Sequence, residues 1–356
     1  MTIDGVLPAR LTSRSIVAGL GALAVVVTLT SCGGEADVEP VSTTSASAPT
    51  PAVPSPTETT PSPISNASPY SGLPNGLGKP VLAVKIDNTG AAQPHAGLEL
   101  ADLVYVEEVE WGLNRLLAIF STQMPDVLGP VRSARVSDID ILQPFADVVF
   151  AYSGAQSKLL PQLAAADVID ASATASYIGW FDDASRRSPV DHMLRPLEVL
   201  GVFPDAAVSK DIGLTFDEEP PPNGSPGSFA AASWADSEVS FSWDEAAGDY
   251  VVGMNGNPSR STQGGSQRAA TVVIQSVTQS DSGYGDKFGG ITPKIEVVGS
   301  GSAVVLRDGK SWLVTWERVS ASDGTTFTLA DGSPMPFAIG QTWIVLLDDV
   351  RTAQVS

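Results

Sequence analysis

The chain has 356 residues, 43% of them hydrophobic, and its 40 acidic side chains outnumber its 20 basic ones. A net charge of −20 argues against nucleic-acid binding, which depends on Lys and Arg side chains that neutralise phosphates. One cysteine and two histidines exclude a disulfide framework, a thiolate zinc site and a three-histidine zinc site. We therefore expect a core held by packing alone, no metal and no other cofactor.

The first 31 residues have the composition of a bacterial signal peptide. Arg10 and Arg14 precede an uncharged apolar run over residues 16–29, which leads into Leu29-Thr30-Ser31-Cys32. The run is shorter than the roughly 20 apolar residues that a membrane-spanning helix needs. We expect cleavage before Cys32, lipidation of its thiol, and an anchor on the extracytoplasmic face of the cell membrane. The alternatives are a plain N-terminal membrane anchor and a structural cysteine.

Residues 32–74 are expected to form a disordered tether. This segment is dominated by Ser, Thr, Pro and Ala with scattered acidic residues, as in Thr43-Thr44-Ser45 and Pro49-Thr50-Pro51. Such a composition offers too little apolar surface to repay the entropy of ordering the chain. The tether would hold the folded part of the protein away from the membrane.

A first folded domain is expected over residues 75–210. Residues 81–87 alternate apolar and polar side chains, and residues 103–109 and 113–120 read as two strands around a turn at 110–112. Helical patterns cover residues 136–142 and, interrupted by Pro161, residues 156–166. Residues 147–152 read as a buried strand. Strands and helices in this order predict an α/β-like domain with a mixed sheet.

A second, mostly β domain is expected over residues 229–356, after a Pro/Gly-rich boundary at 211–228. Asp308-Gly309 and Asp331-Gly332 are typical hairpin turns between its apolar runs. The whole chain is therefore predicted to be α+β. The strands expected in the second domain are residues 239–243, 250–254, 270–276, 294–298, 303–306, 312–317, 325–329 and 342–347.

Charged residues in the first domain are expected to meet on one face of the sheet. Side chains alternate along a strand, so Lys85 and Asp87 emerge on the same face. Pairing of the next two strands about Trp111 would set Glu107 opposite Arg115, where opposite charges attract.

Two basic loops also occur in this acidic chain. Gly129-Pro130-Val131-Arg132-Ser133-Ala134-Arg135 places two guanidinium groups close to an expected helix start, and residues 183–189 contribute Arg187. Arg forks and free backbone N–H groups at such a place bind anions.

Two interpretations of these residues stay open. They could form a partly buried ion-pair network that orders the fold, since breaking one partner of a buried pair costs about 3–5 kcal/mol. They could instead form a ligand site for an anion. The candidate ligand-binding residues are Arg132, Arg135, Arg187, Lys85, Asp87, Glu107 and Arg115.

No convincing catalytic set is visible in the sequence. Asp191 and His192 with Ser185 or Ser188 could be drawn as a triad, but no Gly-x-Ser-x-Gly turn is present and an adjacent Asp and His cannot easily orient each other. A carboxylate pair for glycan cleavage, drawn from Asp87 and Glu107, remains open because sequence does not set the distance between the two carboxyl groups.

Six segments of the chain form a distinctive series. In chain order they are Lys85-Ile86-Asp87-Asn88, Gln93-Pro94-His95-Ala96-Gly97, Gly129-Pro130-Val131-Arg132-Ser133-Ala134-Arg135, Phe181-Asp182-Asp183-Ala184-Ser185-Arg186-Arg187-Ser188-Pro189, Val272-Val273-Ile274-Gln275 and Gly340-Gln341-Thr342-Trp343-Ile344. In this order they resemble the YerB-like lipoproteins. The resemblance covers roughly residues 75–350 and implies two consecutive domains of unknown function behind a lipid anchor. After Pro189 the chain departs from the family's usual His-Asn-Leu-Tyr and reads Val190-Asp191-His192-Met193.

These observations predict an envelope lipoprotein that binds rather than catalyses. Its partners would be the membrane, through the lipid on Cys32, and an anionic or peptidic cell-wall ligand or an envelope protein. The competing hypothesis is an envelope hydrolase that acts on glycan or peptide through Asp87 and Glu107. A third is an assembly factor that uses the second domain as its docking surface.

Overall fold

The structure is a computed structural model that describes residues 66–349 and 352–356. Cys32, on which the lipidation prediction rests, lies outside the described residues, as do the signal segment and the tether up to residue 65. Residues 66–74, which we expected within the tether, instead join the fold. Tyr70 is fully buried and its ring packs edge-on against Phe145, with the ring centroids 5.3 Å apart. Tyr70 therefore anchors the end of this segment in the core, together with the buried Ser71 hydroxyl, which donates to Asp102 at 2.6 Å.

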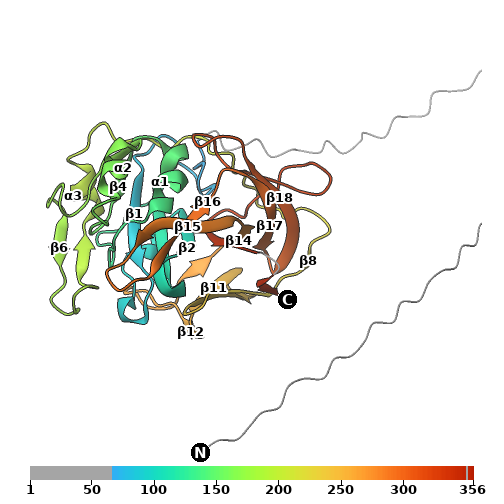
Figure 1. Cartoon of the computed structure of the whole chain (residues 1–356). Coiled ribbons are helices and arrows are strands. Elements are labelled where there is room, and N and C mark those ends of the chain that lie inside the picture. The colour runs from blue at the N-terminus through green and yellow to red at the C-terminus, as the bar shows by residue number, and fades with distance from the viewer. Residues whose placement is uncertain (1–65, 350–351) are drawn as a thin grey trace, which may run out of the picture. The chain divides into compact units, whose positions relative to one another are not determined.

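The dominant element is an 11-stranded sheet that runs through the middle of the molecule (Figure 1). Its strands, in order across the sheet, are β19 (Thr326–Thr328), β18 (Lys310–Arg318), β17 (Gly299–Arg307), β14 (Thr271–Ser276), β20 (Thr342–Leu347), β2 (Leu103–Glu108), β3 (Asn114–Phe120), β1 (Leu82–Asp87), β4 (Val148–Ala151) and β5 (Val168–Asp170), with β8 (Ser225–Pro226) paired to β18.

The two halves of the chain share this sheet. β20 lies between β2 and β14 and pairs in parallel with both, so that Thr342 is the register partner of Leu103 on one side and of Thr271 on the other. The Gln341 side-chain amide also donates to the carbonyls of Leu98 and Ala101. The described residues fall within one compact unit. The expected domain boundaries stay predictions, but hydrogen-bonded strands connect the segments on either side of residues 211–228.

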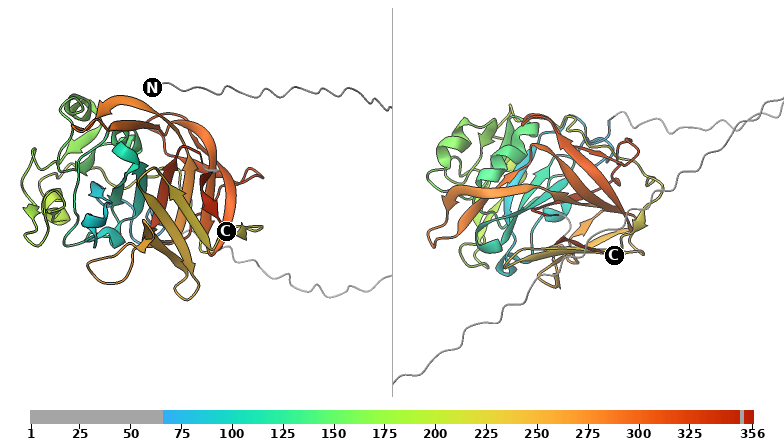
Figure 2. Two further views of the ribbon diagram at one scale, coloured as in Figure 1. Left: turned by 60° about the horizontal axis from the view of Figure 1, so that its bottom comes forward. Right: turned by 45° about the vertical axis from the view of Figure 1, so that its right-hand side comes forward.

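A second, six-stranded sheet covers one face of the large one (Figure 2). Apolar side chains of alternate residues, such as Val84 and Val106, point toward it and are fully buried. Across the interface the Phe241 and Trp343 rings pack edge-on, with centroids 5.9 Å apart. The strands of the second sheet are β12 (Asn257–Pro258), β11 (Asp249–Met254), β10 (Glu238–Asp244), β9 (Phe229–Ser233) and β21 (Gln354–Val355), with β13 (Arg268–Ala269) paired to β11.

Helices and a long hairpin cover the other face. Leu103, Leu117 and Ile344 point toward this side and pack with Ile141 and Phe145. Among the described residues no helix is long and apolar enough to cross a membrane. The remaining elements are α1 (Val136–Leu142), α2 (Leu160–Ala165), α3 (Pro196–Leu200), the hairpins β15 (Thr278–Gly285) with β16 (Ile291–Glu296) and β6 (Trp180–Asp182) with β7 (His192–Leu194), and the 3-10 turns η1 (Gly90–Ala92), η2 (Leu98–Leu100), η3 (Glu110–Gly112) and η4 (Gln143–Phe145).

The predicted α+β fold class is confirmed, with far more strand than helix. The predicted helix over residues 156–166 is shorter in the structure, where α2 begins at Leu160 with Pro161 in its first turn. Proline is tolerated at this place because the first backbone N–H groups of a helix have no partner within it.

Candidate functional site

The segment from Gly129 to Arg135 is held in an extended path beside the end of β1. The Asp87 N–H donates to the Pro130 carbonyl at 3.0 Å, and the Arg132 N–H donates to the Lys85 carbonyl at 2.8 Å. These two bonds continue the sheet past the end of β4 and place the Arg132 side chain beside Asp87. The motif's arginines are therefore positioned by main-chain pairing.

Gly129 is required by the crowding at the start of this segment. Its φ is +145°, a conformation that side-chain-bearing residues avoid. A Cβ added there would lie 2.8 Å from the Met193 sulfur and 3.0 Å from the His192 carbonyl oxygen. Glycine therefore lets the segment pass directly against β7.

The chain itself occupies part of the start of α1, where we expected free backbone N–H groups. The helix has only seven residues, and the Asp138 carboxylate accepts a hydrogen bond from the Arg135 N–H at 2.6 Å as part of a capping box. The N–H group of the residue before the helix is therefore already bonded within the chain.

Lys85, Glu107 and Asp138 form a fully buried ionic cluster. The Lys85 ammonium donates to Glu107 and, at 2.8 Å, to Asp138, and all three side chains have no exposed surface. Burial lowers the pKa of Lys85 to about 8, against the opposing effect of Asp138. The expected register of Glu107 opposite Arg115 is present. The Glu107 carboxylate nevertheless bonds to Lys85.

Two ion pairs lie nearer the surface. Arg132 meets Asp87 at 2.6 Å, and Arg135 meets Glu110 at 2.6 Å. Each guanidinium is largely buried, and each carboxylate is nearly completely so. Together with the Lys85 cluster, these pairs form the ion-pair network that the first interpretation of the sequence described.

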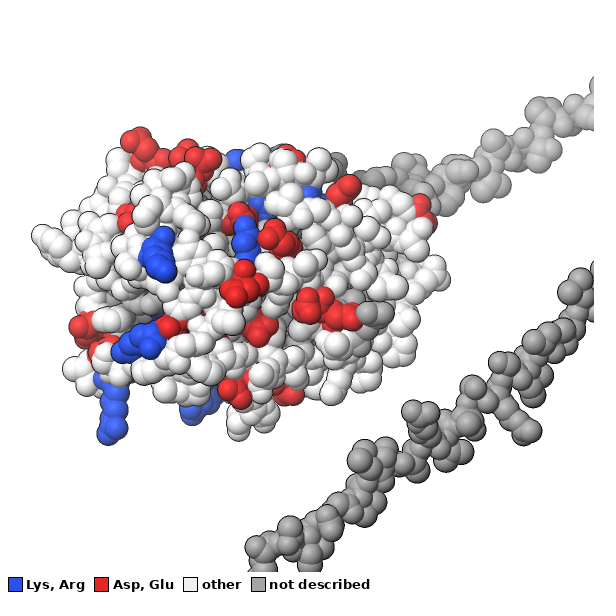
Figure 3. Space-filling model, viewed as in Figure 1, with Lys and Arg blue, Asp and Glu red and all other residues white. Residues whose placement is uncertain are grey.

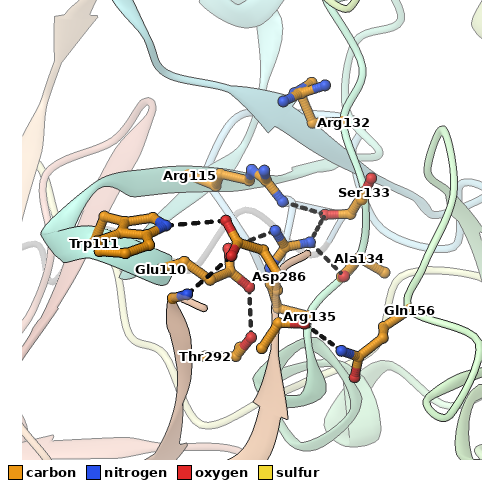
Figure 4. A network of polar contacts seen from close by, with 12 residues as sticks. Glu110, Trp111, Arg115, Arg132, Ser133, Ala134, Arg135, Gln156, Asp286 and Thr292 are labelled. Carbon is orange, nitrogen blue, oxygen red and sulfur yellow. Dashed lines mark hydrogen bonds and ion pairs between the residues drawn. The ribbon is translucent and has the colours of Figure 1, made fainter. Parts of the chain in front are cut away.

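Arg115 is different, because it forms no ion pair with any carboxylate among the residues described. It donates to the Ser133 carbonyl at 3.0 Å, and Arg135 donates to the same oxygen at 3.3 Å (Figure 4). Burial, and then the positive charges of Arg135 and Arg132, lower the pKa of Arg115. The guanidinium stays charged at neutral pH. It lies among like charges, and the Glu110 and Asp87 carboxylates, which oppose the lowering of its pKa, form no ion pair with it.

One open hollow of about 540 Å³, which we call the arginine cleft, is lined by Arg115, Arg132, Arg135 and neighbouring side chains. Four cationic side chains face three carboxylates in its walls, in a protein whose net charge is −20. On the face shown in Figure 3, Lys and Arg side chains are scattered among more numerous Asp and Glu. The charged and aromatic residues of the arginine cleft are Arg115, Arg132, Arg135, Lys287, Asp87, Glu110, Asp286, Trp111 and Phe288.

Aromatic side chains stand in the wall of the arginine cleft. Trp111 is 52% exposed and Phe288 is 74% exposed. Trp111 adopts a left-handed backbone conformation with φ +67°, which is unusual for a bulky residue and costs of order 1–3 kcal/mol. Gly112 follows at φ +67°, and a Cβ there would lie 2.5 Å from the Ala235 Cβ. The Trp111 indole N–H donates to Asp286 at 3.0 Å.

The hairpin β15–β16, from the second half of the chain, supplies one wall of the arginine cleft. Thr292 donates to Glu110, and Gln156 donates to the Gly285 carbonyl. A neighbouring hollow of about 510 Å³ shares Arg135 and Asp286, among other residues, with the arginine cleft and extends past Gln156. The site is therefore an open groove built by both halves of the chain.

The structure brings together only some of the predicted site residues. Asp87, Arg115, Arg132 and Arg135 line the arginine cleft, whereas Lys85 and Glu107 are sealed beneath it. Arg187 is exposed and is not one of the residues that line it.

Arg186, the residue before Arg187, holds two loops together by donating to the carbonyls of Ala92 and Pro94 at 3.0 and 2.5 Å.

The sequence reasoning missed the partners of these residues. Asp138, the cap of α1, closes the Lys85 cluster, and a Glu or Asp at the third position of a helix was a visible signal for it. Lys287 and Phe288 sit in the glycine-rich tip between β15 and β16, which has no alternating apolar pattern to mark its strands. Within the part of the chain that the structure describes, no group of three or more His, Cys, Asp or Glu side chains is placed to hold a metal ion.

Comparison with known proteins gives one consistent result. Residues 71–209 match the N-terminal domain, and residues 229–344 the C-terminal domain, of a protein family of unknown function, DUF3048. The chain is 24% identical over 286 residues to YerB of Bacillus subtilis (strain 168), which is named as a lipoprotein; the match covers 77% of this chain and 83% of YerB. The crystal structure of YerB superposes with a TM-score of 0.69 at 22% identity, covering 82% of this chain and 99% of that one.

Proposed function

The chain belongs to the DUF3048 family of proteins of unknown function, and from this premise we propose that it is a lipid-anchored protein of the cell envelope that binds an anionic ligand in the arginine cleft. The relative named as a lipoprotein and the Leu29-Thr30-Ser31-Cys32 segment support the anchor. The location that follows is the extracytoplasmic face of the cell membrane. The ligand would belong to the cell wall or to an envelope partner.

The unpaired guanidinium of Arg115 carries the binding proposal. Burying a charge is costly unless it is paired and hydrogen-bonded. Arg132 and Arg135 meet that requirement through Asp87 and Glu110, whereas Arg115 has only a carbonyl that it shares with Arg135. An anion in the arginine cleft would supply the missing countercharge and relieve the repulsion among the three guanidiniums.

The ion-pair network and the anion site, which the sequence left as alternatives, then describe different parts of one arrangement. The Arg132–Asp87 and Arg135–Glu110 pairs hold the walls in place, and the buried Lys85 cluster supports them from below. Nothing in this geometry favours the alternative of carboxylate-assisted hydrolysis. Glu107 is fully buried against Lys85, and Asp87 is 1% exposed and engaged by Arg132.

The binding proposal is tested by retention on purified cell-wall sacculi. Arg115→Ala is preferable to Arg132→Ala, because loss of Arg132 would leave the Asp87 carboxylate buried without its partner. We expect the wild-type chain to be retained and Arg115→Ala to lose about tenfold or more in affinity, since a hydrogen bond to a charged group contributes about 1.5–3 kcal/mol.

Arg260→Ala is the matched control, because it removes the same charge from an exposed position outside the arginine cleft. Melting curves establish that all three chains fold. Equal retention of Arg115→Ala and wild type would remove the site assignment. If the wild type is not retained, the ligand does not belong to the wall. A soluble envelope partner should then be sought by crosslinking with the same variants.

The anchor is tested independently of the ligand. Cells that express the chain and grow with labelled palmitate should incorporate label into the wild type and none into Cys32→Ala, because the thiol is the acceptor atom. Label in Cys32→Ala equal to that in the wild type would contradict lipidation at this position.

A further inference from the structure

Resting on the proposed function, we infer that the anion bound in the arginine cleft is a sugar-linked phosphodiester, with its phosphoryl group on Arg115 and a sugar ring against Trp111. Charge, donor geometry and the shape of the groove each point to this chemistry.

The charge balance selects a singly charged ligand. Four cationic and three anionic side chains line the arginine cleft, which leaves one positive charge for the ligand to neutralise. A phosphodiester carries one negative charge, as each phosphate of a nucleic acid does. A terminal phosphate monoester carries about −1.5 to −2 at neutral pH and would leave an excess of negative charge.

The directions of the donors distinguish a phosphodiester from a carboxylate, which carries the same charge. A carboxylate is planar, so one guanidinium fork can satisfy both of its oxygens. Here the donors come from separate elements: Arg115 from β3, Arg132 from the extended segment, and Lys287 from the β15–β16 tip. Each guanidinium has five N–H groups, so the existing ion pairs leave donors available. Donors arriving from several directions suit a tetrahedral phosphoryl group.

The groove and its aromatic wall have room for the two groups that are esterified to the phosphoryl group. The arginine cleft continues into the neighbouring hollow around Arg135 and Asp286, so a ligand can extend on both sides of the anion, as a diester does. Trp111 and Phe288 present exposed aromatic surface among polar groups. Such surface suits a sugar ring, which has an apolar C–H face and a polar edge. The Trp111–Asp286 hydrogen bond fixes the indole in that position.

Isothermal titration calorimetry of the purified full chain tests this inference. The probe is the methyl phosphodiester of α-linked N-acetylglucosamine. Dimethyl phosphate lacks the ring, and methyl N-acetylglucosaminide lacks the charge. Methyl glucuronide, compared with methyl glucoside to allow for its missing N-acetyl group, carries a carboxylate in place of the phosphodiester. We expect the sugar diester to bind about tenfold to a hundredfold more tightly than any of these ligands.

Three variants assign the two contacts. Arg115→Gln should abolish the advantage of the diester over the neutral sugar. Trp111→Ala should abolish its advantage over dimethyl phosphate. Lys287→Gln, at an exposed hairpin tip where a folding defect is not expected, should weaken the diester about tenfold and leave the neutral sugar unchanged.

Each outcome decides one level of the inference. A glucuronide that binds as tightly as the diester would overturn the phosphodiester and leave anion binding intact. Binding of every ligand unaffected by Arg115→Gln and Lys287→Gln would overturn the proposed function as well. The diester on a lipid in vesicles and the diester in a soluble polymer then serve as competitors. Competition by either supports the inference and identifies the source, and competition by neither overturns it.

Discussion

His95 is a buried side chain whose hydrogen bonds require the neutral ring. Its Nε2 donates to the Asp87 carbonyl at 2.7 Å, while Nδ1 faces the Gln93 side-chain amide nitrogen at 3.2 Å. The Gln93 oxygen is already used by the Arg260 N–H, so the amide nitrogen must face the ring. Nδ1 therefore accepts a hydrogen bond and has no place for a proton. Burial lowers the pKa of His95, against the opposing effect of the Asp87 carbonyl.

We predict that His95 makes the folded state less stable in mild acid. The unfolded chain binds a proton at this ring near pH 6.5, whereas the folded chain resists it. The unfolded state therefore holds more protons below pH 6.5, and the free energy of unfolding falls by up to about 1.4 kcal/mol per pH unit as the pH is lowered. Urea unfolding of wild type and His95→Gln at pH 7.5 and 5.0 measures this contribution.

The difference between the two chains isolates His95, because all carboxylates are common to both. His95→Gln should show the smaller loss of stability on acidification. If both chains lose the same free energy of unfolding between pH 7.5 and 5.0, the histidine is not the group responsible.

At the scale of residues, the sequence predicted the register of the strands better than the bonding partners of their side chains. The register of Glu107 with Arg115 follows from the turn at 110–112 and is present. The bonding partner of Glu107 is Lys85, because a long ammonium side chain on the neighbouring part of the sheet reaches it in the dry interior. Asp138 completes the Lys85 cluster and Asp286 accepts the Trp111 hydrogen bond, both from elements far away in sequence, and no local pattern could have paired them.

At the scale of elements, the β15–β16 hairpin and the turn η3 are fitted to each other. A Cβ added at Gly290 would lie 2.4 Å from the Trp111 indole nitrogen and 2.9 Å from the Glu110 Cβ. The close approach allows the Trp111–Asp286 and Thr292–Glu110 hydrogen bonds to form. The wall of the arginine cleft therefore depends on a glycine that lies outside it.

We predict that Gly290→Ala displaces Trp111 and destabilises the protein. Overpacking a closely fitted contact costs about 1–3 kcal/mol. The indole N–H resonance of Trp111, assigned by its loss in Trp111→Phe, should move when the hydrogen bond to Asp286 breaks. Urea unfolding measures the accompanying loss of stability.

Gly90→Ala is the matched control, because a Cβ there meets nothing within 4 Å. It should change the free energy of unfolding by less than about 0.5 kcal/mol. An unchanged Trp111 resonance in Gly290→Ala would mean that the hairpin accommodates the methyl group without moving the indole.

Sequence patterns found the strands with a clear apolar signal. β1 and β10 were predicted from apolar side chains at every second residue, and β20 from an unbroken apolar run. β15 reads Thr-Gln-Ser-Asp-Ser-Gly-Tyr-Gly, in which no residue before Tyr284 is apolar, so it has no such pattern. Its pairing with β16, and the contacts of β16 with α1 and η3, come from tertiary structure.

At the scale of the whole molecule, the decisive feature is that the two halves of the chain complete one large sheet, in which β20 of the second half pairs with β2 of the first. β20 separates β2 from β14, and the second sheet covers the face that carries Val84 and Val106. The sequence indicated a boundary at residues 211–228 because Pro and Gly cluster there. A local composition signal cannot reveal which strands pair across it.

We predict that residues 66–228 do not fold without the rest of the chain. This fragment lacks β20, so the edge of β2 and the apolar face beneath the second sheet would be exposed to water. The fragment should show no cooperative urea transition by circular dichroism, whereas the full chain should show one.

Co-expression of residues 66–228 with residues 229–356 is the complementary experiment. The two fragments should co-purify and recover the transition, because together they contain every strand of the sheet. Cooperative unfolding of residues 66–228 alone would contradict the prediction and establish that half as an independent domain.

The position of β20 also determines when this protein can complete its fold. Gln341 bonds to the carbonyls of Leu98 and Ala101, 243 and 240 residues earlier in the chain. A ribosome delivers the N-terminal end first, at about 5–20 residues per second, so β2 waits roughly 10–50 s for its neighbour. During that interval this edge of β2 has no hydrogen-bonding neighbour from its own chain. Native structure is therefore acquired only after nearly the whole chain has been delivered.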